Sequence, residues 1–373
     1  MGNSVTIDAN RQELWSKDLL ADVERDVKNI FRFMGEGANN TIQVSNELKK
    51  KKGDQENFSL IARLAGDGVT GDAELEGNEE AMLSYNEIVS IDQIRNAVRL
   101  TGKLDNQKVV YDQISSAREN LRIWLREFKA RNYLLKLGGV TNTTLVDTNG
   151  VTVGGRAAWS NTPAFIPDAD TAAGTGARYK GANSSGAASL TATDILTLDM
   201  VTEAATQASL TDPKIQKITM GADDFYVMYV HPYQARDLKK SSDWKTAQQD
   251  ARARGDSNPV FRGALGFWSN VLLLENEYVP WLDVSAAGNS FRGAATGTDF
   301  AVDSARALLC GRQALIVANA SNPEALVVEQ FDYKNKDGVA VSWIGGNQKT
   351  MFNNSSGTAQ EFGVLAVDTA AAA

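Results

Sequence analysis

One segment of the chain matches a nucleotide-binding motif in its residue types and spacing. Residues 66–71 read Gly-Asp-Gly-Val-Thr-Gly, a G-x-G-x-x-G sequence that follows a strand-like run, as a dinucleotide site requires. From residue 67 to residue 80 the chain carries acids and no Lys or Arg, and these acids would repel a pyrophosphate. They are Asp67, Asp72, Glu74, Glu76, Glu79 and Glu80. We therefore interpret the segment as the flexible acidic tip of a hairpin, with a nucleotide-dependent enzyme as the less favoured alternative.

With one histidine and one cysteine, the chain has few of the side chains that usually bind metals or act as nucleophiles. One histidine excludes a site with two His ligands within the chain, and Cys310 alone excludes an intrachain disulfide and a Cys-based zinc site. No G-x-S-x-G sequence supplies a serine nucleophile. His231 stands where a predicted strand meets a predicted helix, just before Pro232, and is expected to cap or pack against that helix. The sequence therefore predicts no enzyme, no cofactor and no metal site.

Two runs of basic residues are candidates for binding rather than catalysis. One recurs at i, i+4, i+8 and i+11, which places Arg118, Arg122, Arg126 and Lys129 on one side of a predicted helix. This basic row is interpreted as a solvated face, as the receptor of a neighbouring subunit's acidic tip in a head-to-tail ring, or as a contact for nucleic acid phosphates. The second run, Lys49, Lys50, Lys51 and Lys52, is interpreted as a solvated linker, with DNA contact as the alternative.

A long helix and an extended hairpin are expected to position these residues. Residues 105–137 carry apolar side chains at three-and-four spacing, namely Val110, Ile114, Ala117, Leu121, Trp124, Leu125 and Phe128. A helix of that length would span roughly 50 Å, more than a compact domain of this size needs. Another helix is predicted at 16–34, and strands at 58–64 and 86–100 flank the acidic tip. A long helix with a projecting hairpin is typical of a subunit that assembles into a larger structure.

The second half of the chain predicts a mixed domain. Residues 138–190 are rich in Gly, Ser and Thr and predict loops and short strands. Beyond them we expect a helix at 193–209, strands at 217–230 and 271–279, and mixed helix and strand signals at 304–318. The tail alternates apolar and polar residues and predicts an antiparallel sheet.

Composition limits the class of protein. With 373 residues the chain exceeds the ~250–300 residues that one core normally serves, so two cores are expected. The net charge of −8 argues against a surface that binds nucleic acid throughout. We expect no membrane span, since no run approaches ~20 apolar residues, and no signal peptide. The Gly/Ser/Thr-rich middle and seven tryptophans leave a secreted or surface carbohydrate-binding protein as the alternative.

Several long segments together carry a family resemblance. They are VVYDQISSARENLRIWLREFKARNYLLKL (109–137), HPYQARDLKKSSDW (231–244), NPVFRGALGFWSNVLLLENEYV (258–279), ALLCGRQALIVA (307–318) and the closing GVAVSWIGGNQKTMFN and FGVLAVDT. In order and coverage the chain resembles the Hong Kong 97-type phage capsid fold, an α+β class. In detail it resembles the major capsid proteins of N-four-like podoviruses and related tailed phages.

The resemblance implies a role for each segment. The expected divisions are an N-terminal arm at 1–55, an extended loop hairpin at 56–100, a peripheral domain with spine helix at 101–137, an insertion or surface loops at 138–190, an axial domain at 191–318, and returning peripheral strands at 319–373. The implied function is a major capsid protein that self-assembles into hexamers and pentamers of an icosahedral head around double-stranded DNA. The implied partners are other copies, portal and scaffolding proteins, a decoration protein and the packaged DNA. The implied location is the virion capsid, assembled in the host bacterial cytoplasm.

Overall fold

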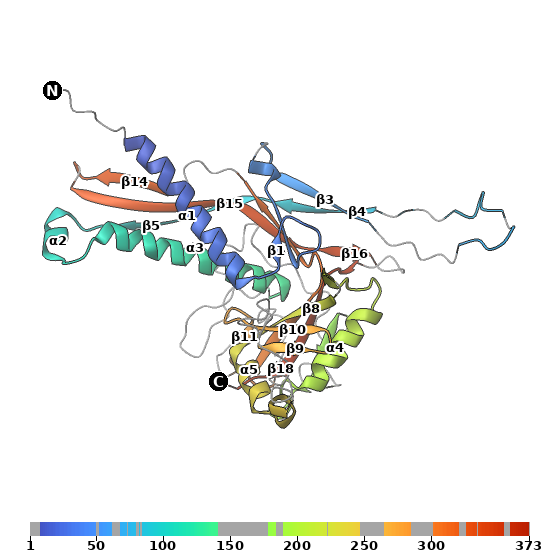
Figure 1. Ribbon diagram of the computed structural model, residues 1–373. Coiled ribbons are helices and arrows are strands. Elements are labelled where there is room, and N and C mark those ends of the chain that lie inside the picture. Colours follow the sequence, from blue (N-terminus) through green and yellow to red (C-terminus); the bar gives the residue numbers. More distant parts are fainter. Residues whose placement is uncertain are drawn as a thin grey trace.

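Two large β-sheets and a projecting hairpin make up the computed structural model (Figure 1). It describes residues 8–49, 52–61, 68–72, 74–79, 82, 84–140, 178–183, 189–221, 223–246, 265–284, 301–320, 326–333, 335–353 and 359–372. Most of the predicted insertion at 138–190 therefore lies outside the described residues. Helices and mostly antiparallel strands occur in both halves, and the strands from β9 to β18 follow one another with no described helix between them, in agreement with the α+β prediction.

The first sheet lies against the two longest helices. Its strand order is β1-β2-β13-β15-β14, and β5 pairs with β15. The bounds are β1 Met34–Gly35, β2 Ile42–Ser45, β5 Asp92–Arg99, β13 Leu315–Asn319, β14 Leu326–Phe331 and β15 Lys336–Lys349, with α1 Asp8–Ile30 and α3 Gln113–Leu137. The apolar faces of α1 and α3 enter one core with these strands, through Val23, Phe31, Leu125 and Trp343 among others. Burial of these faces holds the helices on the sheet.

The second sheet forms the other half of the body. Its order is β6-β18-β12-β8-β10-β9, with β11 paired to β12 and β7 to β8. The bounds are β6 Tyr179–Gly181, β7 Ile218–Met220, β8 Asp223–Val230, β9 Gly266–Trp268, β10 Val271–Glu275, β11 Trp281–Leu282, β12 Ser304–Cys310 and β18 Val364–Ala370, with α4 Leu198–Leu210 and α5 Pro232–Lys240. Apolar residues of α4, α5 and these strands form a second core, so the prediction of two cores is confirmed.

The remaining elements are short or project from the body. Strands β3 (Gln55–Ile61) and β4 (Ser84–Ser90) pair as an antiparallel hairpin, which confirms the predicted hairpin. The second arm, predicted at 86–100, is divided, because β5 pairs with β15 instead of β3. Strand β16 (Met351–Asn353) pairs with β17 (Ala359–Glu361). The 3-10 helix η1 (Glu47–Lys49) precedes the hairpin, and α2 (Lys103–Lys108) precedes α3.

The prediction of one helix from residue 105 to residue 137 is wrong in its first part. Helix α2 ends at Lys108, the backbone of the next residue, Val109, is extended, and α3 begins after Asp112. The Asp112 carboxylate accepts a hydrogen bond from the backbone N–H of Ile114 at 3.0 Å and so caps the new helix. Helix α3 has 25 residues, about 37 Å rather than 50 Å. Val110, expected in the apolar stripe, therefore lies outside the helix and is fully exposed.

Three other predictions are corrected by the structure. Helix α4 begins at Leu198, after the cap Thr197, instead of at 193. Residues 304–318 are two strands, and Gly311 allows the crossing between them, because a Cβ there would overlap the backbone oxygen of Gln216. The tail strands do not form one sheet: β14 and β15 join the first sheet, and β18 pairs with β12 in the second. The division into peripheral and axial domains stays a prediction.

Candidate assembly surfaces

The hairpin projects from the body and is held firmly at its base (Figure 1). The Glu87 carboxylate accepts a hydrogen bond from the backbone N–H of Met351 at 3.2 Å. The ring of Tyr85 lies edge-on to Phe352, with 4.2 Å between centroids. Strand β4 continues into β5 with only Ile91 between them, so the hairpin is a direct extension of the first sheet.

The hairpin tip exposes both acids and large apolar side chains. Asp72, Glu74, Glu76 and Glu79 are exposed, whereas the predicted site residues Asp67 and Glu80 lie outside the described residues. Leu75 and Met82 are 60% and 67% exposed. Acids beside unburied apolar groups are typical of a surface that awaits a partner.

The G-x-G-x-x-G segment lies in this tip rather than at the start of a helix. Gly68 and Gly71 adopt φ values of 68° and 65°, the left-handed turn region. Among the described residues from 68 to 82 no helix begins, so the arrangement that places a pyrophosphate at a helix N-terminus is missing there. The interpretation as a hairpin tip agrees with these positions.

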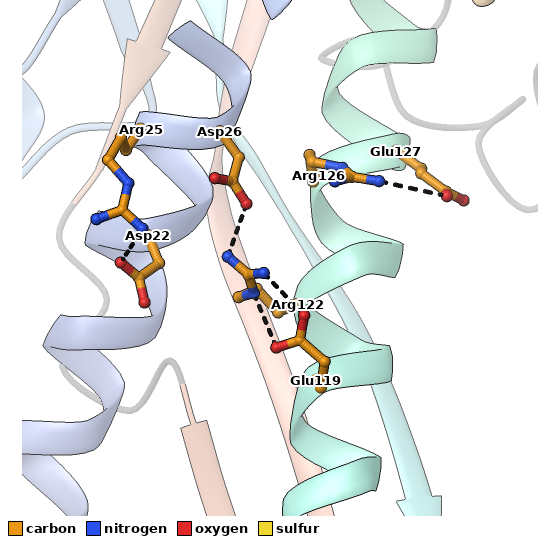
Figure 2. Close-up of polar contacts among 7 residues, drawn as sticks. All are labelled: Asp22, Arg25, Asp26, Glu119, Arg122, Arg126 and Glu127. Carbon is orange, nitrogen blue, oxygen red and sulfur yellow. Dashed lines mark hydrogen bonds and ion pairs between the residues drawn. The ribbon is translucent and has the colours of Figure 1, made fainter. Parts of the chain in front are cut away.

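The basic row of α3 faces α1 of the same chain. Figure 2 shows the Arg122 guanidinium between the two helices. Its Nη1 donates to Asp26 at 2.7 Å, and its Nε and Nη2 donate to the two oxygens of Glu119 at 3.0 and 2.8 Å. The hydrogen bonds that Arg122 donates to Glu119 raise the pKa of Arg122 and lower the pKa of Glu119. Arg122 is thus held by intrachain acids.

Lys129 is buried, which corrects its prediction as a surface contact. Its side chain is 2% exposed, and its Nζ lies 4.4 Å from the ring centroid of Trp343 on β15. Desolvation lowers its pKa to about 8. The spacing correctly placed Lys129 with the row, but α1 and β15 cover that face. The acids of α1, such as Asp22 and Asp26, were the signal in the sequence that an intrachain partner existed.

The other two members of the row are half-buried. The Nη2 of Arg126 lies 3.8 Å from Glu127, a long contact drawn in Figure 2. Burial lowers the pKa of Arg118, and the charge of Asp112 opposes that effect. Arg118, Arg122 and Arg126 are therefore all partly accessible to solvent, whereas Lys129 is not.

The lysine run is described only at its two ends. The Nζ of Lys49 lies 3.1 Å from Glu24 of α1, and Lys52 is exposed. Lys50 and Lys51 lie outside the described residues. The contact between Lys49 and Glu24 joins the start of the hairpin to α1.

His231 has the capping role predicted for it. Its Nδ1 accepts a hydrogen bond from the backbone N–H of Tyr233 at 3.3 Å, while Gln234 completes a capping box. Its ring stacks on Trp281, and burial lowers its pKa to about 4. Cys310 is buried, and burial raises the pKa of its thiol. Across the described stretches no three His, Cys, Asp or Glu side chains gather as a metal site requires.

A second exposed apolar surface lies at the opposite end from the hairpin, and the sequence patterns did not predict it. It consists of Leu104, Val110, Tyr111, Phe331 and Tyr333. Its residues fall in α2, in the link to α3 and in the turn after β14 (Figure 1). Interruption of the long helix created this surface, because the break leaves Val110 and Tyr111 outside any helix.

Comparisons with known proteins are consistent along the whole chain. A family model described as phage capsid protein matches residues 4–373. The major capsid protein of Pseudomonas phage KPP25 is 28% identical over 99% of this chain and 97% of its own length. None of these findings supports the carbohydrate-binding alternative. In the described part of the chain, no helix is long and apolar enough to cross a bilayer.

Solved structures extend the likeness to the fold. The capsid of Ralstonia phage GP4 matches with a TM-score of 0.75 and 26% identity, over 92% of this chain and 90% of that one. The capsid of Cyanophage Pam1 gives a TM-score of 0.68 at 24% identity, over 91% of each chain. A Helicobacter pylori bacteriophage, KHP30, gives 0.63 at 16% identity, over 91% of this chain and 90% of that one.

Proposed function

Because this chain belongs to the phage capsid protein family, we infer that it is the major capsid protein of a phage head and assembles with copies of itself into the shell. The observation that carries this function is the match of residues 4–373 to the family, together with a curated major capsid relative of nearly equal length. The predicted Hong Kong 97-type architecture is consistent with the neighbouring capsid structures. The hexamers, pentamers and icosahedral symmetry implied by the resemblance are part of this proposal.

The hairpin is the proposed contact between neighbouring subunits within a ring. It carries acids and exposed apolar groups outward, and it is anchored at its base, so a neighbour meets a surface already in position. On the receiving subunit the candidates from the basic row are Arg118 and Arg126, which are half-buried and lie on the same side of α3. Lys129 is buried and Arg122 is held by Asp26 and Glu119, so these two are weaker candidates. A head-to-tail contact of this kind closes into a ring.

Many such contacts of modest strength would hold the shell together. Each subunit in a ring both gives a hairpin and receives one, so the loss of any single contact leaves the subunit attached through the others. Linked contacts of this kind raise the overall affinity well above that of one interface. No catalytic step is part of this function, and the proposed role is structural.

Contact with packaged double-stranded DNA is proposed for the lysine run, Lys49 to Lys52. Lysines bind phosphates without sequence preference, and a local cationic segment is compatible with the net charge of −8. Of the two described members, Lys49 lies 3.1 Å from Glu24 and Lys52 is exposed, so Lys52 is the stronger candidate. The overall negative charge limits indiscriminate DNA capture before packaging.

Other proposed partners follow from the resemblance. A separate scaffolding protein and a portal protein are proposed partners, as the resemblance implies. A decoration protein is a further candidate on the outside. Assembly is proposed to take place in the cytoplasm of the bacterial host.

Particle size tests the proposed function. The protein is expressed alone and with a candidate scaffolding protein, and the products are examined by light scattering and negative-stain microscopy. Rings, shells, tubes or polyheads are expected. A stable monomer that assembles under neither condition, even with crowding agents, contradicts the proposal.

A further inference from the structure

We propose that the fold couples assembly to formation of the C-terminal strands, so that a chain in which these strands have not formed is excluded from rings. The hairpin is made early in synthesis, but the strands that hold it against the body, β13, β15 and β16, are made late. The proposal rests on the proposed function, since it assumes that the hairpin is the contact between neighbouring subunits. It adds a regulatory property of that contact, namely the stage at which the hairpin becomes available.

The base of the hairpin contacts residues that lie far along the chain. Val89 of β4 packs with Ile316 and Ala318 of β13 in a small buried cluster. The hydrogen bond from the backbone N–H of Met351 to the Glu87 carboxylate joins residues that are 264 positions apart. A hairpin that has just been made therefore lacks these contacts until β13, β15 and β16 follow.

The strand that continues the hairpin depends on the same part of the chain. In the described sheet β5 pairs with β15 alone, through eight residue pairs along its length. Strand β15 also pairs with β13 and β14, so it lies inside the first sheet. Its Val339, Val341 and Trp343 are buried in the first core. Without β15 the strand at the root of the hairpin has no partner in the sheet.

Strand β18 completes the second sheet in the same way. It lies between β6 and β12 and pairs with β12 through seven residues, all of them buried. Val364 enters the first core, whereas Leu365 and Val367 enter the second. Asp368 brings the carboxylate that pairs with the buried guanidinium of Arg306 on β12. The two cores are therefore complete only when β18 is in place.

Contacts with the body continue beyond β18. The indole Nε1 of Trp281 donates a hydrogen bond to the carbonyl oxygen of Ala371 at 2.9 Å. The backbone N–H of Ala371 donates to the carbonyl oxygen of Asp303 at 2.8 Å. The Arg236 guanidinium donates to the carbonyl oxygen of Ala372 at 2.6 Å. Residues that follow the last strand thus take part in the folded structure.

The separation of these partners in sequence sets the order in which the subunit folds. A chain is synthesised with its N-terminal part first, and pairings between distant segments form late because closing a long loop costs conformational entropy. Helices α1 and α3 therefore cannot bury their apolar faces fully until β15 is present. An incomplete subunit offers its neighbours no positioned hairpin, and this protects a ring from members that would leave a gap in it.

Folding during synthesis tests the proposal on the whole chain. The full sequence is followed by a flexible linker and a translational arrest sequence, and the length of the linker sets whether β15 to β18 have left the ribosome. Trypsin cleavage after Arg95 and Arg99 reports whether β5 is paired, because a protease cuts a strand that has opened. Cleavage after Lys52, which is exposed in the folded subunit, is the internal control.

We expect cleavage after Arg95 and Arg99 to be about tenfold faster with a short linker than with a long one, whereas cleavage after Lys52 is equally fast with both. Slow cleavage of β5 with the short linker overturns this inference alone, because the root of the hairpin would then be held before the C-terminal strands leave the ribosome. Fast cleavage with both linkers overturns it as well, because the C-terminal strands would then not secure β5.

A full-length variant tests exclusion from rings. Leu365→Asp with Val367→Asp places carboxylates in the second core and prevents β18 from packing there. Leu365→Val with Val367→Ile is the matched control, because it keeps both side chains apolar. Each variant carries an N-terminal tag and is produced together with the untagged wild type. Immunoblotting then measures the tagged fraction of the total protein and of the purified shells.

We expect the acidic variant to be depleted about tenfold from shells relative to its share of the total protein, whereas the control enters in proportion. The yield of wild-type shells should stay unchanged. Entry of the acidic variant in proportion, or a fall in the yield of wild-type shells, overturns this inference and leaves the proposed function intact. A wild type that assembles under no condition overturns the proposed function and, with it, the exclusion from rings.

Discussion

Arg306 of β12 and Asp368 of β18 form a two-point ion pair in the interior of the second sheet. The guanidinium Nε and Nη2 donate to the two carboxylate oxygens, each at 2.8 Å, and both side chains are nearly inaccessible to water. Nη1 also donates to the carbonyl of Gly138 at the end of α3, at 2.9 Å. One side chain thus ties the long helix of the first half to two strands of the second.

Removal of one partner of this pair should destabilise the subunit. Arg306→Ala leaves the Asp368 carboxylate buried without its main cation, and is expected to lower the free energy of unfolding by ~3–5 kcal/mol. Denaturant unfolding of the unassembled subunit measures this. The double variant Arg306→Met with Asp368→Leu should lose less than Arg306→Ala, because no buried charge remains. A larger loss in the double variant would contradict this account.

The contact between Asp26 and Arg122 should hold α1 on α3. A double-mutant cycle with Asp26→Ala and Arg122→Ala is expected to give a coupling free energy of about 1 kcal/mol, since both side chains are partly buried. Hydrogen exchange in α1 should accelerate in either single variant. Arg25→Ala is the control, because Arg25 pairs with Asp22 on the same helix and is mostly exposed. No change in α1 exchange would rule out the tie.

The proposed ring contact predicts that charge reversal on either side blocks assembly. Arg126→Glu should prevent ring formation, as should Glu74→Lys with Glu76→Lys and Glu79→Lys in the hairpin. Combining the two reversed sets should restore rings, because opposite charges face each other again. Analytical ultracentrifugation of each protein and of the combined variant measures this. Arg122→Glu is a poor test, because it also breaks the contact with Asp26. If rings form and only DNA retention falls, the docking idea is wrong.

His231 should make stability depend on pH between about 4 and 6.5. Its folded pKa is about 4 and its ordinary value is 6.5, so over this range the unfolded chain binds more protons. The contribution of His231 to the free energy of unfolding is fully present above pH 6.5 and is lost as pH falls through 4. That contribution is on the order of 1–3 kcal/mol. Asn also caps helices and does not titrate, so His231→Asn should show a smaller loss of unfolding free energy over this range than the wild type. Equal losses would assign the pH dependence to other groups.

Local patterns predicted those elements whose signals lie within one stretch of chain. The hairpin, the cap at His231 and the buried strand β8 all follow from short-range spacing and turn residues. The predicted start of the long helix was wrong because the apolar spacing continues N-terminally through Val110, whereas the helix begins after the cap at Asp112. Apolar spacing alone does not locate a helix end; the residue that satisfies the free N–H groups does.

Pairing between distant segments was not predictable in the same way. Alternation in the tail indicates strands, but it does not say that β18 pairs with β12 and β15 with β5. The surroundings of the basic row could not be predicted either. The spacing correctly placed its four cations on one side of the helix, but only the folded structure shows that α1 and Trp343 lie over Lys129. The role of these cations as a contact between subunits therefore stays a prediction, and Lys129 is withdrawn from it because it is buried.

Because β4 continues into β5, a mechanical force applied to the hairpin is transmitted to the first sheet. Strand β5 pairs with β15 along its whole length, from Asp92 opposite Gly345 to Arg99 opposite Gly338. Antiparallel hydrogen bonds run across the strands, so tension along the hairpin loads all of them together in shear instead of peeling them apart singly. A neighbour that binds the tip would thus meet mechanical resistance from the entire ladder, which suits a subunit built into a shell.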